Sequence, residues 1–138
     1  MRRLRPFHQN DIDAVLALWQ HAGLILSHSD QPANLQRKAA YDPELFLVLE
    51  EDAQLIGVVM GAYDGRRGWI YHLAVAPTRQ GEGLGQQLVH ALEDRLQAKG
   101  CDKVNLLIEP SNRRVQSFYE KLGYQTDELI FMEKWLRE

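Results

Sequence analysis

Three segments of strand-like composition follow one another closely before the middle of the chain. They are Leu45 to Glu50, Leu55 to Tyr63 and Trp69 to Val75. Only short polar turns, Glu51-Asp52 and residues 64–68, separate them. Such short connections join antiparallel neighbours, because a parallel crossover takes about a dozen residues or more. The segment is therefore predicted to fold as an antiparallel meander.

Helical and further strand patterns surround this meander. In the first helical pattern, apolar residues stand at i, i+3, i+4 and i+7 counted from Ile12. The patterns predict four helices: from Asn10-Asp11 to near Gly23, through Leu35, Arg37 and Ala40 to Asp42-Pro43, over residues 84–99, and from an N-cap at Ser111 to Gly123. Further strands are predicted at Leu4 to Phe7, Lys103 to Glu109 and Leu129 to Leu136. The crossover through 84–99 makes its two strands parallel, which gives a mixed sheet flanked by helices.

Composition sets limits on partners and location. The chain has 138 residues without an internal repeat or linker, so residues 1–138 are expected to form one domain. Sixteen basic and nineteen acidic residues give a net charge of −3, which offers no electrostatic case for nucleic acid or an acidic membrane. No apolar run approaches the roughly 18 residues of a membrane span. Cys101 is the single cysteine, so no disulfide is expected, and a cytoplasmic location is predicted.

A glycine-spaced loop follows the third strand of the meander. Gly81, Gly83 and Gly85 stand at alternate positions immediately before the long helix. Glycine permits positive φ and close backbone approach, and the first amides of a helix lack internal partners, so N–H groups can converge there on a phosphate. The spacing fits neither a Rossmann fingerprint nor a P-loop. A plain strand-to-helix turn is the alternative to a phosphate site.

Two motifs in the second half of the chain resemble a known family. Gln80 to Gly85 matches the Q/R-x-x-G-x-G/A motif of the GNAT superfamily of N-acetyltransferases, and the preceding Leu73 to Pro77 is similar to its usual lead-in. Asn112 and, seven residues later, Tyr119 match the second signature. Met60 to Gly68 resembles small bacterial members of the YpeA type. The resemblance implies an α+β, α/β/α layered fold: the GNAT acyl-CoA N-acyltransferase fold, with a mixed, mostly antiparallel sheet of about six or seven strands and about four helices.

The resemblance also implies which residues bind the co-substrate acetyl-CoA. Backbone amides from Gln80 to Gly85 would hold the pyrophosphate, and the backbone of Leu73 and Val75 would pair with the pantetheine arm. Arg79 would contact a phosphate or remain a solvated loop residue, and Asn112 would bind pantetheine or cap a helix. The implied cofactor-binding residues are Leu73, Ala74, Val75, Arg79, Gln80, Gly81, Glu82, Gly83, Leu84, Gly85, Asn112 and Tyr119. No metal is implied.

The family's general acid corresponds to Tyr119, which would protonate the departing coenzyme A thiolate. A phenol of pKa about 10 is a suitable donor to a thiolate whose conjugate acid has a pKa of about 8.5. The alternative is a core aromatic residue. Many relatives carry a glutamate or histidine as base at positions matching Trp69 or Tyr71, or a glutamate at the position matching Leu107, and this chain does not. Strand alternation offers Glu109 instead, acting through a water with Tyr71, and places His72 on the face opposite Tyr71 as a packed histidine.

The acceptor side is predicted to involve Leu24 to Asp42, the turn Tyr63 to Gly68 and a short C-terminal hairpin. His28, Asp30 and Asp64 are polar candidates there, each weighed against a solvated loop residue. The short C-terminal segment suggests an open site for a peptide end or a small polyfunctional amine. The leading hypothesis is an N-acetyltransferase that works in a ternary complex with acetyl-CoA and a primary amine. A catalytically weak or inactive acyl-CoA-binding regulatory module is the alternative, aminoacylated tRNA is disfavoured by the charge, and homodimerisation stays open.

Overall fold

A computed structural model describes residues 1–137 of the chain. These residues form two compact units, residues 1–107 and the residues from 108 onward. The first unit contains a sheet with three of the α-helices, and the second contains the fourth α-helix. The four predicted helices are therefore all present.

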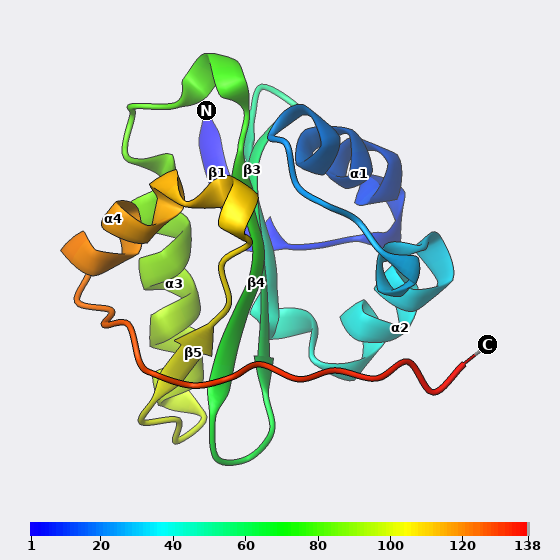
Figure 1. The fold of residues 1–138 in the computed structure, drawn as a ribbon. Coiled ribbons are helices and arrows are strands. Elements are labelled where there is room, and N and C mark those ends of the chain that lie inside the picture. The colour runs from blue at the N-terminus through cyan, green and yellow to red at the C-terminus, as the bar shows by residue number, and fades with distance from the viewer. Residues whose placement is uncertain (138) are drawn as a thin grey trace. The chain divides into compact units, whose positions relative to one another are not determined.

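The first unit is built on a five-stranded sheet (Figure 1). Its strands are β1 (Arg2–Pro6), β2 (Phe46–Glu51), β3 (Gln54–Tyr63), β4 (Gly68–Val75) and β5 (Val104–Leu106), in the spatial order β1-β2-β3-β4-β5. Neighbouring strands are antiparallel except β4 and β5, which are parallel. The chain crosses between these two through α3 (Leu84–Ala98). Both the predicted meander and the predicted parallel pair are confirmed.

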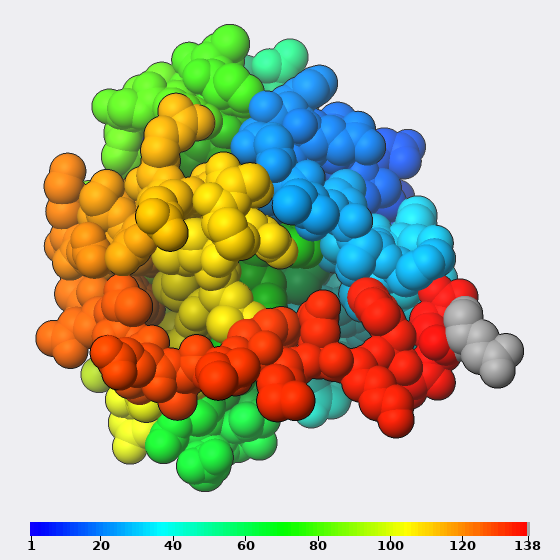
Figure 2. Space-filling view, in the orientation of Figure 1, coloured from blue at the N-terminus to red at the C-terminus, as the bar shows by residue number. Residues whose placement is uncertain are grey.

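Helices cover both faces of this sheet, which gives the predicted α/β/α layers (Figure 1). On one face, α1 (Ile12–His21) and α2 (Pro32–Tyr41) pack over a common core with strand residues. The buried members of this core are Phe7, Ile12, Val15, Leu18, Trp19, Leu35, Phe46, Val48, Val58, Met60 and Ala74. In Figure 2, the surface of α1 lies next to the surface of α2. The opposite face carries α3.

Helix α1 begins where the sequence predicts. Asp11 precedes its first residue and accepts a hydrogen bond of 2.8 Å from the backbone N–H of His8, in a capping box. Arg5 of β1 contacts the same carboxylate at 2.8 Å and reaches Glu50 of β2 at 2.6 Å. The helix ends before Gly23, which has φ of +83°, as expected for a C-terminal glycine. The Arg5 contacts thus tie the start of α1 to two strands.

Three glycines allow α3 to approach the sheet closely. An added Cβ would lie 2.8 Å from a Leu88 methyl at Gly57, and at Gly68 it would lie 3.1 Å from a Leu96 methyl of α3 and 2.9 Å from the Cys101 sulfur just beyond the helix. At Gly61 it would overlap both Cδ atoms of Leu92, one of them at 2.8 Å. Leu88 and Leu92 are fully buried. The side chains of α3 therefore occupy the volume that residues larger than glycine would take.

Gly61→Val is expected to destabilise the protein by about 1–3 kcal/mol, because extra methyl groups overpack a filled core. For a chain of this size the melting temperature falls by about 4–12 °C. Thermal unfolding followed by circular dichroism measures the change. In a Leu92→Ala background, where the clash is removed, the same substitution should cost clearly less. Equal costs in both backgrounds would contradict the close approach of α3.

The second unit differs from two predictions. It contains a 3-10 turn, η5 (Pro110–Asn112), and α4 (Arg114–Lys121). Ser111 lies within η5 and is not the N-cap of α4, whose N-cap residue is Arg113. The predicted strand Leu129 to Leu136 is wrong: within the described part it has no regular structure, and its side chains are exposed (Figure 2). Apolar alternation produces a strand only where a neighbouring strand supplies hydrogen bonds.

The sheet accordingly has five strands in residues 1–137, and not six or seven. The strand predicted over Lys103 to Glu109 is also shorter, since β5 covers Val104 to Leu106. Its ladder with β4 ends at the pair Ile70 and Leu106. At His72, two residues after Ile70, β4 has a bulge that disrupts regular pairing, so the ladder with β5 does not continue along this strand.

Candidate active site

The glycine-spaced loop links β4 to α3. It begins with the 3-10 turn η4 (Pro77–Arg79), in which the backbone N–H of Arg79 donates to the carbonyl of Ala76 at 2.8 Å. Gly81 and Gly83 then take φ of +86° and +79°. An added Cβ at either position meets no atom within 4 Å. These glycines are required by the backbone conformation of the loop, and not by crowding around it.

The loop ends at the N-terminus of α3, a helix of 15 residues. Gly83 is the N-cap residue, its carbonyl accepts a bond of 3.1 Å from Gln87, and no side chain caps this end. First-turn amides of a helix have no intrahelical partner and carry the positive end of the dipole. Gln80 to Gly83 are exposed. The arrangement is suited to binding an anion through backbone N–H groups.

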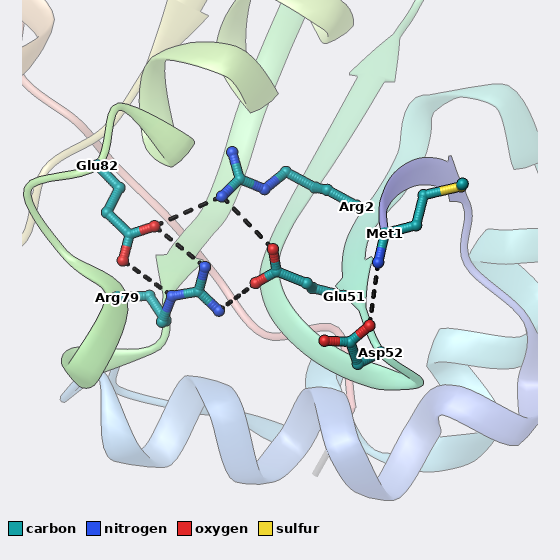
Figure 3. Close-up of polar contacts among 6 residues, drawn as sticks. All are labelled: Met1, Arg2, Glu51, Asp52, Arg79 and Glu82. Carbon is teal, nitrogen blue, oxygen red and sulfur yellow. Dashed lines mark hydrogen bonds and ion pairs between the residues drawn. The ribbon is translucent and has the colours of Figure 1, made fainter.

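Arg79 does not point freely into solvent (Figure 3). Its guanidinium forms two bonds to the Glu82 carboxylate, at 2.8 and 3.0 Å, and reaches Glu51 at 2.5 Å. Arg2 joins the same network at 3.5 Å from Glu82 and 3.7 Å from Glu51. The guanidinium of Arg79 holds the pKa of Glu82 below its ordinary value. Two arginines and two glutamates thus connect the loop to β1 and β2, and a phosphate contact by Arg79 stays a prediction.

Beyond the loop, the β4 edge that faces β5 is open at its C-terminal end. The ladder with β5 includes only Gly68, Trp69 and Ile70. Residues 71–75 therefore have no β5 partner, so the two strands separate beyond Ile70. The carbonyl of Val75 lies 3.5 Å from the side-chain nitrogen of Gln80. The backbone of Leu73 to Val75 presents an edge on which an extended ligand could add hydrogen bonds.

A bulge interrupts β4 at His72. The register passes from Val58 opposite Ala74 to Met60 opposite Tyr71, so β4 holds one residue more than β3 in this stretch. His72 takes φ of +47°, an uncommon value for a residue with a Cβ. Its carbonyl accepts a 3.0 Å bond from the indole N–H of Trp19. The bulge is thereby fixed from α1.

The bulge overturns the prediction that His72 faces away from Tyr71. Cross-strand partners share a face, so Tyr71 lies on the same face as Met60, which packs in the core with Trp19. The His72 ring lies on that face too, 4.9 Å from the Trp19 ring. Strict alternation placed the two side chains on opposite faces. The extra residue of the bulge resets the alternation.

The polar candidates of the acceptor side differ in their surroundings. Asp30 belongs to the 3-10 turn η2 (His28–Asp30) and is buried, so its reading as a solvated loop residue is wrong. Its carboxylate lies 2.9 Å from the ring of His72. Asp64 accepts backbone bonds from Arg66 and Arg67, which lower its pKa. Asp64 therefore shapes its own turn. His28 is exposed.

The remaining predicted residues belong to the second unit. Tyr119 on α4 is buried, and this burial raises its pKa well above the ordinary value. Its ring packs edge-on against Phe118 and Tyr124, at centroid distances of 5.0 and 5.5 Å. Asn112 and Glu109 are exposed. Since β5 ends at Leu106, the strand alternation that selected Glu109 does not extend to it.

Sequence reasoning missed two residues that shape the site. Glu51 reads as part of a turn, yet it binds Arg79, and Trp19 reads as a core residue, yet its N–H fixes the bulge. Neither contact has a signal in the spacing of residues. In the described range 1–137, no three His, Cys, Asp or Glu side chains gather as metal ligands would, and no helix is long and apolar enough to cross a membrane.

An antiparallel meander, a glycine loop at a helix N-terminus and a parallel strand that leaves its neighbour early are the features that the sequence resemblance implied. Comparison with known proteins agrees. Residues 12–124 match the acetyltransferase (GNAT) family. An acetyltransferase of Yersinia pestis is 41% identical over 133 residues, which cover 96% of this chain and 94% of that protein. The chain belongs to the GNAT family of acetyltransferases.

Solved structures share the fold at lower identity. The PaiA N-acetyltransferase of Thermoplasma acidophilum, solved with coenzyme A, is 18% identical with a TM-score of 0.79, covering 94% of this chain and 93% of that one. A predicted acetyltransferase of Clostridium acetobutylicum, solved with acetyl-CoA, is 20% identical with a TM-score of 0.74, covering 96% of both chains. At this identity the likeness concerns the fold.

Proposed function

We propose that the protein is an N-acetyltransferase that transfers the acetyl group of acetyl-CoA directly to a primary amine in a ternary complex. One observation carries the proposal: an uncapped helix N-terminus, reached through two positive-φ glycines, follows immediately after an unpaired strand edge. Acetyl-CoA consists of a charged pyrophosphate joined to an extended amide-containing arm. A cluster of free amides beside an open strand edge fits both parts.

Within this proposal the first unit binds acetyl-CoA. The amides between Gln80 and Gly85 receive the pyrophosphate, and the backbone of Leu73 and Val75 pairs with the pantetheine arm. The two structural neighbours with coenzyme A or acetyl-CoA bound support this choice of ligand, as do relatives named acetyltransferase. Asn112 and Arg79 are proposed as additional contacts.

The chemistry requires two proton movements. An alkylammonium acceptor must lose a proton before its nitrogen can attack, and the departing thiolate must gain one. Tyr119 is proposed as the acid because it matches the family's second signature; burial raises its pKa, which keeps the hydroxyl protonated but makes it a weaker proton donor. Glu109, through a water and with Tyr71, was the sequence candidate for the base and remains a prediction. Positioning of the two substrates supplies much of the remaining rate.

Gly83→Trp is expected to abolish the micromolar binding of acetyl-CoA that we predict for the wild type. A side chain at φ of +79° strains the loop, and an indole obstructs the amides behind it. Isothermal titration of acetyl-CoA measures the loss. At a ligand concentration of one hundred times Kd, the wild type gains about 2.7 kcal/mol of stability, equivalent to about 10 °C.

Gly65→Trp is the matched control, since Gly65 also has positive φ, +96°, and open space around it but lies in the turn between β3 and β4. This variant should bind acetyl-CoA as the wild type does. No binding by the wild type at millimolar acetyl-CoA would refute the proposal. Binding without turnover of any amine would instead favour the acyl-CoA-binding regulatory module, which the missing glutamate or histidine at Trp69, Tyr71 and Leu107 suggests.

A further inference from the structure

A histidine lies at the point where the open edge of β4 begins. His72 is two residues beyond the last β5-paired residue, Ile70, and directly precedes Leu73. The bond from Trp19 to its carbonyl fixes its backbone, and the Trp19 ring lies edge-on to its imidazole. The side chain is 26% exposed. His72 is thus rigidly held yet accessible to a small molecule.

A buried carboxylate orients this imidazole. Asp30 is 7% exposed; its Oδ1 lies 2.9 Å from Nε2 of His72, and its Oδ2 accepts a 2.9 Å bond from the backbone N–H of Ser27. Burial alone raises the pKa of Asp30, but the bonds from His72 and Ser27 outweigh it and hold the pKa below its ordinary value. Asp30 is therefore ionised at neutral pH and can only accept a hydrogen bond.

An ionised Asp30 determines which ring nitrogen of His72 carries the hydrogen. The Nε2–H group donates to the carboxylate, so the neutral ring keeps its lone pair on Nδ1. Within residues 1–137, no hydrogen bond to Nδ1 is present. The pair has the arrangement in which a carboxylate holds a histidine in the tautomer of a general base.

We propose that His72 is the general base that removes a proton from the acceptor amine, and that Asp30 is a positioning residue that fixes its tautomer. This inference rests on the proposed N-acetyltransferase function. It follows from a single juxtaposition: a carboxylate-oriented histidine beside the unpaired backbone of Leu73 to Val75, where the thioester arm is proposed to lie. The base then comes from the first unit, and Glu109 is not required for this step.

The proton and electron balance of the step is complete. The acceptor ammonium gives one proton to Nδ1 of His72, and the freed nitrogen lone pair attacks the thioester carbonyl carbon. The C–N bond forms and the C–S bond breaks. The sulfur takes a proton from Tyr119. The acceptor nitrogen loses its second proton to solvent, and solvent returns a proton to the Tyr119 oxygen. His72 returns its proton to solvent, so one proton is released per turnover.

The side chains beside the His72 ring differ in charge. The ionised carboxylate of Asp30 contacts the ring, the indole of Trp19 on α1 is uncharged, and Tyr71 is a titratable neighbour on β4. Burial raises the pKa of Tyr71 above the ordinary value, with a further contribution from Asp64. Tyr71 is therefore neutral at pH 7, and its own titration does not add charge beside the imidazole.

His72→Gln is expected to lower kcat/KM by about 10²–10⁴-fold, the range for loss of a general base. Glutamine can still donate a hydrogen bond to Asp30 but cannot take a proton. Trialanine and 1,4-diaminobutane serve as acceptors, and free coenzyme A is followed over a pH series. Deprotonation of the acceptor amine itself makes kcat/KM rise with pH in both proteins, so the readout is a difference in the shape of the pH profile between the wild type and His72→Gln. His21→Gln, at an exposed histidine on α1, is the matched control and should behave as the wild type.

A second measurement does not depend on turnover. Two-bond ¹H–¹⁵N correlation spectra of the ¹⁵N-labelled protein should show His72 with hydrogen on Nε2 and a bare Nδ1 at neutral pH.

Asp30→Asn should disturb this tautomer and lower kcat/KM, while the Kd of acetyl-CoA stays unchanged. These results would support the assigned roles. If the pair of His72 and Asp30 were purely structural, substituting either residue would leave the pH profile of kcat/KM unchanged.

The failures are distinguishable. If the wild type acetylates either amine and His72→Gln does so with equal rate and pH profile, the role of His72 is overturned while the proposed function stands. A spectrum with hydrogen on Nδ1 overturns it as well. A wild type that binds acetyl-CoA but acetylates no primary amine in a wider screen contradicts the proposed function itself.

Discussion

Tyr119→Phe is expected to lower kcat for amine acetylation by about 10²–10⁴-fold and to leave the Kd of acetyl-CoA nearly unchanged. The substitution removes only the hydroxyl group. The ring contacts with Phe118 and Tyr124 are kept, so the packing of α4 should persist. Burial raises the pKa of this phenol, so its proton remains bound across the neutral range but is harder to transfer to the leaving thiolate.

Steady-state release of free coenzyme A and titration with acetyl-CoA measure the two parts of this prediction. Tyr41→Phe provides the control for the acetyl-CoA titration, since Tyr41 is 78% exposed at the end of α2, on the predicted acceptor side. A Tyr119→Phe enzyme with the wild-type kcat would show that the tyrosine is only a packed aromatic residue. A large loss of acetyl-CoA affinity would place its hydroxyl in binding, and not in proton transfer.

Trp19→Ala is expected to destabilise the protein by about 3–5 kcal/mol, the usual cost of deleting a large buried aromatic side chain. Trp19 is fully buried and stacks on Phe46, with ring centroids 6.4 Å apart. In addition, the substitution leaves the carbonyl of His72 without its donor. Thermal unfolding should show a fall of about 12–20 °C in melting temperature.

Trp19→Phe separates the two contributions. It keeps most of the apolar volume and removes the indole N–H, so the expected cost is about 1–3 kcal/mol for an unpaired buried carbonyl, with a smaller term for packing. The same variant should loosen the bulge at His72, which proton exchange of the β4 amides would detect. Equal stabilities of the phenylalanine variant and the wild type would show that the hydrogen bond does not hold the bulge.

Local patterns predicted most of the fold. Helix α1 is recognisable from the spacing of Ile12 and Trp19, and its ends from Asp11 and Gly23, because these signals act within a few residues. The meander follows from turns too short for any other connection. The glycine loop was equally readable, since positive φ at Gly81 and Gly83 is a local requirement. Each of these features depends on neighbours in sequence.

The errors concern contacts between distant segments. The bulge in β4 is accompanied by a bond from the Trp19 indole to the His72 carbonyl, and no spacing rule indicates it. Asp30 reads as a loop residue because its partner lies in another element. The segment Leu129 to Leu136 has a strand-like pattern, but a strand also needs an edge to pair with. Strand alternation selected Glu109 as a candidate base, but β5 ends at Leu106, so the alternation does not extend to that residue.

The ion-pair network at the glycine loop has a consequence for how an anion reaches the protein. Arg2 and Arg79 are balanced by Glu51 and Glu82, so the group as a whole carries no net charge (Figure 3). A neutral group produces little long-range field, and the amide dipoles of α3 act only near the helix end. For the pyrophosphate binding proposed at this loop, we therefore expect no long-range steering by this group, and the rate of association should vary little with ionic strength.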